Sequence, residues 1–499
     1  MESKLATSAD APPRPHVVLV ASPSAGHLNP MAELARRLVA RLGLAATLVT
    51  FTGLSAAGPD AHSTAALSSL RDAGVDTAVL PAAPLEGLPA GARVETALFE
   101  LIARSVPRLR ALLRDIGSAA PLAALVPDSF AAAVLPLATE LGVPGYLFFP
   151  VSLCLLSFVR RAVELNDGAA PGEYRELPDA LRLPGGVSLR REDYADGFQS
   201  SKEPLYAQLI EEGRRYRAAD GFLVNTFYEM EPGNVEELRQ AAEQGTFPPA
   251  YPVGPFVRSS CGEDAASPCI EWLDRQPTGS VVYVSFGSAG TLSVEQTAEL
   301  AAGLEDGGHR FLWVVRMPSL DGEHSDLGKT RADDESDPLA WLPEGFLDRT
   351  SCRGLAVASW APQVRVLSHP ATAVFVSHCG WNSALESVAS GVPMVAWPLR
   401  AEQRVNAAVL SEKAGAALRP RAARADGLIG REEVAAAVRE LMEGEKGRAV
   451  RRRTGDLRQA ADVAWAPEGS SRRAMEEVAG RWKAAAFGGR ARGAMVNVT

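Results

Sequence analysis

The stretch Trp360–Gln403, WAPQVRVLSHPATAVFVSHCGWNSALESVASGVPMVAWPLRAEQ, decides the fold of this chain. The apolar run 373–377 predicts a buried strand, and the apolar residues of 384–389 repeat with a helical period. The polar segment 378–383 lies between them. A helix that begins directly after a strand aims unpaired backbone N–H groups and the positive end of its dipole at one point. We therefore predict a phosphate-binding turn here.

Polar side chains around this turn can bind the rest of a nucleotide. His378, Asn382 and Glu386 recur at every fourth position, so in helical geometry they share one face. Gly380 has no Cβ and lets the backbone approach an anion closely. We expect phosphate at one end of this face and ribose at the other.

The stretch resembles the signature box of the plant secondary-product UDP-sugar glycosyltransferases, also called family 1, over almost all of its length. The likeness extends to residues 342–346 and 480–483, shared with the subgroup that acts on hydroquinone and monolignols. A flat indole suits a flat base, and a carboxylate can accept from two ribose hydroxyls. The resemblance implies that Trp360 stacks on uracil, that Gln363 and Glu386 hold the ribose, that His378, Asn382 and Ser383 contact the diphosphate, and that Trp381, Glu402 and Gln403 face the sugar. Ser288 follows a glycine turn after the expected strand 281–285, where it can meet the charge of the leaving diphosphate, and Ala361 and Gly380 are assigned to the same UDP-sugar site.

Length and charge limit the class of protein. At 499 residues the chain is long enough for two sizeable domains. A net charge of -9 argues against nucleic acid or an anionic membrane as the main partner. No apolar run is long enough to span a membrane, and the first one, Val17–Ala21, is too short for a secretory signal. We expect a cytoplasmic monomer with reduced thiols at Cys154, Cys261, Cys269, Cys352 and Cys379.

Short β-rich runs alternate with helical patterns along the whole chain, which is typical of parallel α/β sheets. Asn29 and Pro30 are expected to open the first helix as N-cap and first-turn proline. We predict two Rossmann-like domains facing across a cleft, with ligands beyond the carboxyl ends of the strands. The resemblance names this fold GT-B. The expected strands are 16–21, 122–126, 146–149 and 222–225 in the first half, and 281–285, 311–315, 355–359, 373–377 and 394–397 in the second.

The domain boundaries follow from composition and from the resemblance. Residues 1–250 are expected to form an acceptor-binding domain, and 269–470 the UDP-sugar-binding domain. The Pro- and Gly-containing segment 251–268 is the predicted linker. By resemblance, residues 471–499 hold a helix that crosses back onto the first domain, followed by a tail. The acidic segment 318–338 is expected to be a surface loop.

The box holds only the donor, so the catalytic base has to come from the first half. His27 follows the first strand, and histidine has a near-neutral pKa that suits it to take a proton from a hydroxyl. Asp128 follows the strand 122–126 and can orient the imidazole and stabilise its cation. The family carries such a pair. Two alternatives stay open: His27 caps a turn, or Asp128 is a solvated acid displaced by the unusual Pro127.

The resemblance implies an inverting transfer of glucose from UDP-glucose to a small phenolic hydroxyl, giving a β-glucoside. Gln403 at the end of the box, with Trp381 inside it, is the family pattern for glucose. No Asp-x-Asp pair occurs in the chain, so we expect neither a metal ion nor another cofactor. The alternatives are another acceptor class, such as a flavonoid, transfer to N, S or C, or a non-catalytic UDP-sugar-binding protein. A nicotinamide dehydrogenase is disfavoured because no Gly-x-Gly-x-x-Gly is present.

The acceptor pocket is the part that the sequence describes least. Five apolar residues after Asp128 either line a slot for an aromatic ring or belong to the core. Arg400 departs from the subgroup, which has an aromatic or uncharged residue there; it either alters acceptor or sugar contacts or projects to solvent. The five candidates are Phe130, Phe148, Phe149, Leu153 and Phe158.

Overall fold

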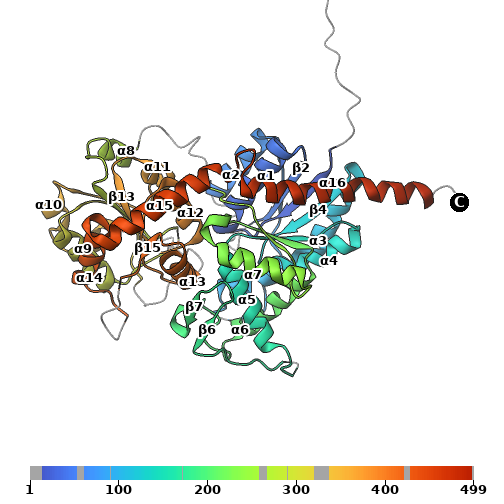
Figure 1. Ribbon diagram of the computed structural model, residues 1–499, viewed down its shortest axis with the longest axis horizontal. Coiled ribbons are helices and arrows are strands. Elements are labelled where there is room, and N and C mark those ends of the chain that lie inside the picture. Colours follow the sequence, from blue (N-terminus) through green and yellow to red (C-terminus); the bar gives the residue numbers. More distant parts are fainter. Residues whose placement is uncertain are drawn as a thin grey trace, which may run out of the picture.

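The computed structural model describes residues 14–52, 61–89, 91–170, 172–257, 267–288, 290–319, 337–420 and 427–496. Cys261, most of the predicted surface loop 318–338 and the middle of the predicted linker lie outside these ranges. Two α/β halves lie side by side, with the first half in blue and green and the second in yellow and orange (Figure 1).

The first half is built on parallel strands. They form one sheet in the order β3-β2-β1-β4 and another in the order β5-β8-β9, and single parallel bridges join β4 to β5. The strands are β1 (His16–Val20), β2 (Ala45–Phe51), β3 (Asp76–Leu80), β4 (Leu122–Pro127), β5 (Tyr146–Phe149), β8 (Gly221–Val224) and β9 (Ala250–Pro252). The helices are α1 (Ala25–Leu42), α2 (Ala61–Asp72), α3 (Val94–Ala119), α4 (Leu135–Leu141), α5 (Leu153–Asn166), α6 (Pro204–Arg215) and α7 (Pro232–Glu243). A small antiparallel hairpin, β6 (Ala180–Arg182) and β7 (Ser188–Arg190), is followed by the short helix η2 (Arg191–Asp193).

The second half has one parallel sheet in the order β12-β11-β10-β13-β14-β15. Its strands are β10 (Val281–Ser285), β11 (Arg310–Val315), β12 (Gly354–Ala358), β13 (Thr372–Ser377), β14 (Met394–Ala396) and β15 (Ala417–Leu418). Its helices are α8 (Pro268–Leu273), α9 (Val294–Gly307), α10 (Phe346–Thr350), α11 (Gln363–Ser368), α12 (Trp381–Ser390), α13 (Gln403–Ala408), α14 (Arg431–Glu443) and α15 (Glu445–Val463).

The side chains of the central strands alternate between the two faces of the sheet, and each face packs against a layer of helices. Successive side chains of a strand point to opposite faces, so β1 contributes Val17 and Leu19 to a core under α1 and Val18 and Val20 to a core against α3. Both β1 and β10 are buried along their whole length, as expected for parallel strands covered by helices on both faces. In each sheet, the first strand of the half has later strands on both sides: β1 lies between β2 and β4, and β10 lies between β11 and β13. Ligands of such sheets bind beyond the carboxyl ends of these strands, and several predicted site residues follow β1, β4, β10 and β13.

Two predicted boundaries are wrong. Helix α1 begins at Ala25, and Pro30 lies inside it. Pro30 is the sixth residue of α1, so the helix lacks the bond that an amide at this position would donate to the Gly26 carbonyl. The predicted linker starts too early, since Tyr251 and Pro252 belong to β9 and Val253 is buried in the core of the first half.

The last helix, α16 (Ser470–Val496), runs across the first half (Figure 1) and contacts β4 and β9. Trp482 is fully buried and meets the ring of Tyr146 edge to face, with 5.4 Å between ring centroids. Apart from the start of the linker, the predicted division of the chain stays a prediction, with domains at 1–250 and 269–470, a linker at 251–268 and a last segment at 471–499. None of the helices in the described part of the chain is both long and apolar enough to span a membrane. Among the described cysteines, Cys154, Cys269, Cys352 and Cys379 are free thiols.

Candidate active site

His27 and Asp128 form a hydrogen-bonded pair beyond the carboxyl ends of β1 and β4. Nδ1 of His27 lies 2.9 Å from Oδ2 of Asp128. The carboxylate is 0% exposed and the imidazole 12%. The Ser22 amide donates to Oδ2 at 2.6 Å and its hydroxyl to Oδ1 at 2.8 Å, while the Phe130 amide donates to Oδ1 at 3.1 Å. These donors fix the position of the Asp128 carboxylate, which holds Nδ1 of His27 and leaves Nε2 to accept a proton.

Pro127 does not displace this carboxylate. It is the last residue of β4, paired with Val20, and a proline can end a strand without breaking the ladder. The backbone N–H of Asp128 still donates to the Val20 carbonyl at 2.9 Å. Because Asp128 is buried and fully hydrogen-bonded, the alternative of a solvated strand-end acid is wrong.

Aromatic rings hold the imidazole of His27 in place. Phe130 stacks on it with 4.6 Å between centroids and an interplanar angle of 11°. Phe99 of α3 meets Phe130 edge to face at 5.5 Å. Phe99 was not among the predicted site residues, because in the sequence it looks like any apolar position of an amphipathic helix. The phenyl rings of Phe130 and Phe99 therefore form an aromatic surface beside His27.

The turn after β13 exposes a helix N-terminus, as the box predicts. Cys379 takes a left-handed conformation with φ 64°, and α12 begins two residues later. The first intrahelical bond runs from the Ala384 amide to the Gly380 carbonyl at 3.0 Å. The amides of residues 381–383 therefore have no acceptor within the helix and can bind a phosphate.

His378 does not share a helical face with Asn382 and Glu386, so that prediction is wrong. Its backbone precedes α12, and its ring packs against two glycines that approach it from different loops. A Cβ added at Gly287 would lie 2.6 Å from the ring, and one at Gly380 would lie 2.4 Å from Nε2. Both positions consequently need glycine if His378 is to stay beside the α12 N-terminus.

The imidazole of His378 is neutral at physiological pH. Burial lowers its pKa to about 4, and the positive charge of Arg400 acts in the same direction. Nδ1 of His378 and Oδ1 of Asn382 are buried and have no hydrogen-bond partner among the described residues. A neutral imidazole can donate one hydrogen bond to an anion without carrying a charge. Unsatisfied buried polar atoms at this turn mark the place where a ligand completes the site.

One hydrogen bond connects the turn to the catalytic pair. Nδ2 of Asn382 donates to the carbonyl of Gly26 at 3.0 Å, directly beside His27. In a regular helix this carbonyl would accept the amide of residue 30, but Pro30 has no N–H. The proline therefore frees Gly26 to bind the second half of the molecule.

The proposed ribose end lies one turn further along α12. Nε2 of Gln363 donates to Glu386 Oε2 at 2.7 Å and to Ser383 Oγ at 2.9 Å. Trp360 is 58% exposed, which is unusual for tryptophan and leaves a ring face free for a base. Ala361 beside it is buried. The arrangement fits the predicted roles of Trp360, Gln363 and Glu386.

The proposed sugar end approaches His27. Burial raises the pKa of the Glu402 carboxyl, and its own backbone amide, His27 and the Asn406 side chain lower it in part. Oε1 of Gln403 accepts the amides of Leu399 and Arg400 at 2.9 and 3.0 Å. Trp381 is only 3% exposed.

The indole of Trp381 contributes to the contact between the two halves, since its N–H donates to the Asn225 carbonyl at 2.7 Å. Only its ring edge or backbone can therefore face a sugar. Ser288 is exposed at the end of the glycine turn after β10.

Most of the predicted acceptor pocket is core. Phe130 lies at the site, but Phe148 and Phe158 are 0% exposed. The other four candidates lie on β5 and on the buried side of α5, where the sheet and the helices cover them. The prediction that they line a slot for the acceptor is wrong, because all four pack in hydrophobic clusters of the interior: Phe148, Phe149, Leu153 and Phe158.

Within the described ranges, no group of three or more His, Cys, Asp or Glu side chains is placed to hold a metal ion. The prediction that catalysis needs no metal ion stays untested.

A helix N-terminus linked by Asn382 to a buried His–Asp pair, between two Rossmann-like halves, is the arrangement expected of a nucleotide-sugar glycosyltransferase. Residues 227–451 match the protein family described as UDP-glucoronosyl and UDP-glucosyl transferase. The chain is 43% identical to UDP-glycosyltransferase 72B1 of Arabidopsis thaliana, over 94% of this chain and 96% of that protein. It is 42% identical to hydroquinone glucosyltransferase of Rauvolfia serpentina, over 94% of this chain and 98% of that protein.

A solved structure agrees with these relatives. Phytolacca americana UGT2, complexed with UDP-2fluoro-glucose and pterostilbene, superposes with a TM-score of 0.82 at 40% identity and covers 94% of this chain and 99% of that one. The chain belongs to the plant family-1 UDP-glycosyltransferases. The predicted family, GT-B fold and enzyme class are thereby confirmed.

Proposed function

We propose that this enzyme transfers glucose from UDP-glucose to a hydroxyl of a small phenolic acceptor with inversion, using His27 as the base and Asp128 as its partner. The observation that carries the proposal is the buried 2.9 Å pair of His27 and Asp128, linked through Gly26 and Asn382 to the N-terminus of α12. A protein that only bound UDP-sugars would have no use for such a pair.

The geometry supports a single displacement. Nε2 of His27 takes the proton of the acceptor hydroxyl, and the oxygen attacks the anomeric carbon from the face opposite UDP. The bond to the diphosphate oxygen breaks, and UDP leaves with the bonding electrons. Negative charge on the diphosphate is met by the α12 amides, Asn382, Ser383 and the neutral His378. Asp128 stabilises the imidazolium of His27 until the proton passes to water.

Two observations support an aromatic acceptor. Relatives include a hydroquinone glucosyltransferase and a structure that holds pterostilbene. The rings of Phe130 and Phe99 beside His27 offer an apolar, aromatic surface on which a phenol ring can stack. A flavonoid, or an N, S or C acceptor, would use the same base and is an outcome of an acceptor panel. We also propose a cytoplasmic monomer that needs no metal ion.

UDP-glucose is expected to be a better donor than UDP-galactose. Two backbone amides hold the carbonyl oxygen of Gln403, so its NH₂ group is the part of the amide proposed to donate to the sugar. An amide fixed in this way can donate to an equatorial hydroxyl of glucose, whereas the axial 4-hydroxyl of galactose points elsewhere. The measurement is kcat/KM for both donors with hydroquinone, read by mass spectrometry of the glycoside and by UDP release. A higher value for UDP-galactose would overturn the donor assignment, and binding of UDP-glucose without any UDP release would overturn the enzymatic function.

A further inference from the structure

We propose that Asp196 is a positioning residue that makes the sugar end of the donor site depend on contact with the acceptor-binding half. The proposal rests on the proposed function, because it assumes that Glu402 and Gln403 face the sugar. Asp196 itself touches neither substrate. It acts through the turn 398–402, which connects β14 to α13.

The backbone of this turn is held from two sides. Within the second half, Gln403 accepts the amides of Leu399 and Arg400. From the first half, Asp196 accepts the Ala401 amide through Oδ2 at 2.7 Å, and its own amide donates to the Ala401 carbonyl at 3.0 Å. Ala401 has φ 53°, a left-handed conformation that alanine rarely adopts unless its surroundings enforce it. Asp196 thus holds both polar backbone atoms of the residue that precedes Glu402.

The same carboxylate is fixed by a charge from the helix that follows. Arg404, in the first turn of α13, hydrogen-bonds Oδ1 of Asp196 through Nη1. The Asp196 side chain is 20% exposed, so solvent screens this ion pair only in part. Arg93 is farther away, with Nη2 at 3.9 Å from Oδ2. One side chain of the first half therefore connects the turn and the start of α13, on either side of Glu402 and Gln403.

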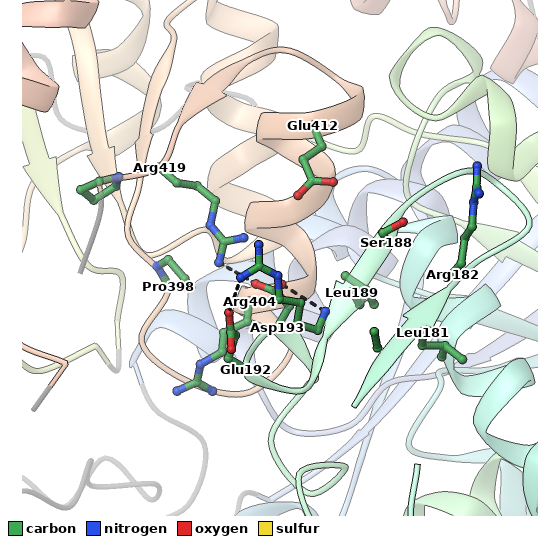
Figure 2. Close-up of a pocket in the computed structure, with 13 residues that line it drawn as sticks. Leu181, Arg182, Ser188, Leu189, Glu192, Asp193, Pro398, Arg404, Glu412 and Arg419 are labelled. Atoms are coloured by element: carbon green, nitrogen blue, oxygen red, sulfur yellow. Dashed lines mark hydrogen bonds and ion pairs between the residues drawn. The ribbon is translucent and has the colours of Figure 1, made fainter. Parts of the chain in front are cut away.

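Apolar side chains of the two halves also pack together near this contact, and Ala195 and Val405 belong to one hydrophobic cluster. A cavity of about 800 Å³ lies between the hairpin β6–β7 and the segments around Pro398 and β15 (Figure 2). Its walls carry several charged side chains, among them Arg419, which donates to Oδ1 of Asp193 at 2.8 Å. This second ion pair joins the same two halves, and among the described residues neither side chain hydrogen-bonds the turn 398–402. It provides a matched control for Asp196.

Asp196→Ala is expected to raise the KM for UDP-glucose roughly ten-fold and to lower kcat, because the lost charge-assisted bonds leave the sugar contacts misplaced. The Kd of UDP should stay unchanged, since UDP lacks the sugar and its proposed contacts lie elsewhere. Asp196→Asn keeps an oxygen for the Ala401 amide but loses the charge beside Arg404, and an intermediate KM is expected. Asp193→Ala should leave both the KM for UDP-glucose and the Kd of UDP close to those of the wild type.

The experiment compares the full-length wild type with these variants and with Glu402→Ala, by steady-state kinetics and by calorimetric titration with UDP. If Asp196→Ala behaves like Asp193→Ala while Glu402→Ala raises the KM for UDP-glucose, the positioning role is wrong and the proposed function stands. If Glu402→Ala has no effect either, the proposed sugar site itself is wrong. If the affinity of Asp196→Ala for UDP falls by the same factor as its KM for UDP-glucose rises, the substitution disrupts the whole donor site, and the inference is overturned as well. Should Asp196→Ala not fold, Asp196→Asn decides by the same comparison.

Discussion

His27→Ala is expected to lower kcat for a phenolic acceptor by roughly 10²- to 10⁴-fold, the usual contribution of a general base. The proton of the acceptor hydroxyl would then have no acceptor, since Asp128 is buried behind the imidazole and accepts bonds from Ser22 and Phe130. The affinity for UDP should not change, because His27 is proposed to contact the acceptor and not the nucleotide. Initial rates with UDP-glucose and calorimetric titration with UDP measure the two quantities.

A matched control separates this effect from the loss of any histidine. His369 also pairs with an aspartate, Asp274, at 3.1 Å, but both residues belong to the second half, directly after α11 and α8. His369→Ala should therefore glucosylate at the wild-type rate. Asp128→Asn should be severely impaired too, though less with thiol or aniline acceptors, which need less help in losing a proton. If His27→Ala glucosylated a phenol at a near-normal rate, His27 would not be the general base.

Glu386→Ala is expected to weaken UDP binding by an order of magnitude or more. Its carboxylate is proposed to accept from both ribose hydroxyls, and bonds of this kind contribute about 1.5–3 kcal/mol each. The substitution also releases Nε2 of Gln363, which donates to Glu386 Oε2 at 2.7 Å, so the second ribose ligand loses its orientation. Calorimetric titration with UDP gives the affinity directly, because UDP retains the ribose and both phosphates. The KM of the acceptor should change little.

Glu305→Ala is a suitable control for the loss of a carboxylate in the same half. Glu305 lies on α9 and pairs with Arg349 on the surface, remote from the box. Its substitution should leave the affinity for UDP as it is in the wild type. An unchanged UDP affinity in folded Glu386→Ala would mean that α12 does not present this residue to the nucleotide.

The donor half could be predicted because its chemistry is local in sequence. A strand, a turn and the start of a helix within residues 372–386 bring the backbone amides, Asn382 and Glu386 together, and no distant contact is needed to form them. His378 is the exception. Its place depends on Gly287, from a loop far away in sequence, and on the backbone turn at Cys379, neither of which a helical period reveals.

The acceptor side could not be predicted to the same degree. An apolar residue that lines a pocket and one that fills a core have the same sequence pattern, so Phe148 and Phe158 were indistinguishable from Phe130 until the packing was known. Pro30 illustrates a second limit. Its ring marks a helix start in sequence statistics, but here it lies inside α1 and leaves the Gly26 carbonyl to Asn382 of the other half.

The most direct test of the proposed chemistry is the anomeric configuration of the product formed from UDP-glucose and hydroquinone, determined by proton NMR of the purified glucoside. Single displacement at an α-linked donor predicts a β-glucoside, recognised by the large coupling between axial protons on the first two carbons of glucose. His27 can serve as the base of such a displacement only if the acceptor attacks from the side opposite UDP. An α-glucoside, or release of free glucose without any glucoside, would contradict the account.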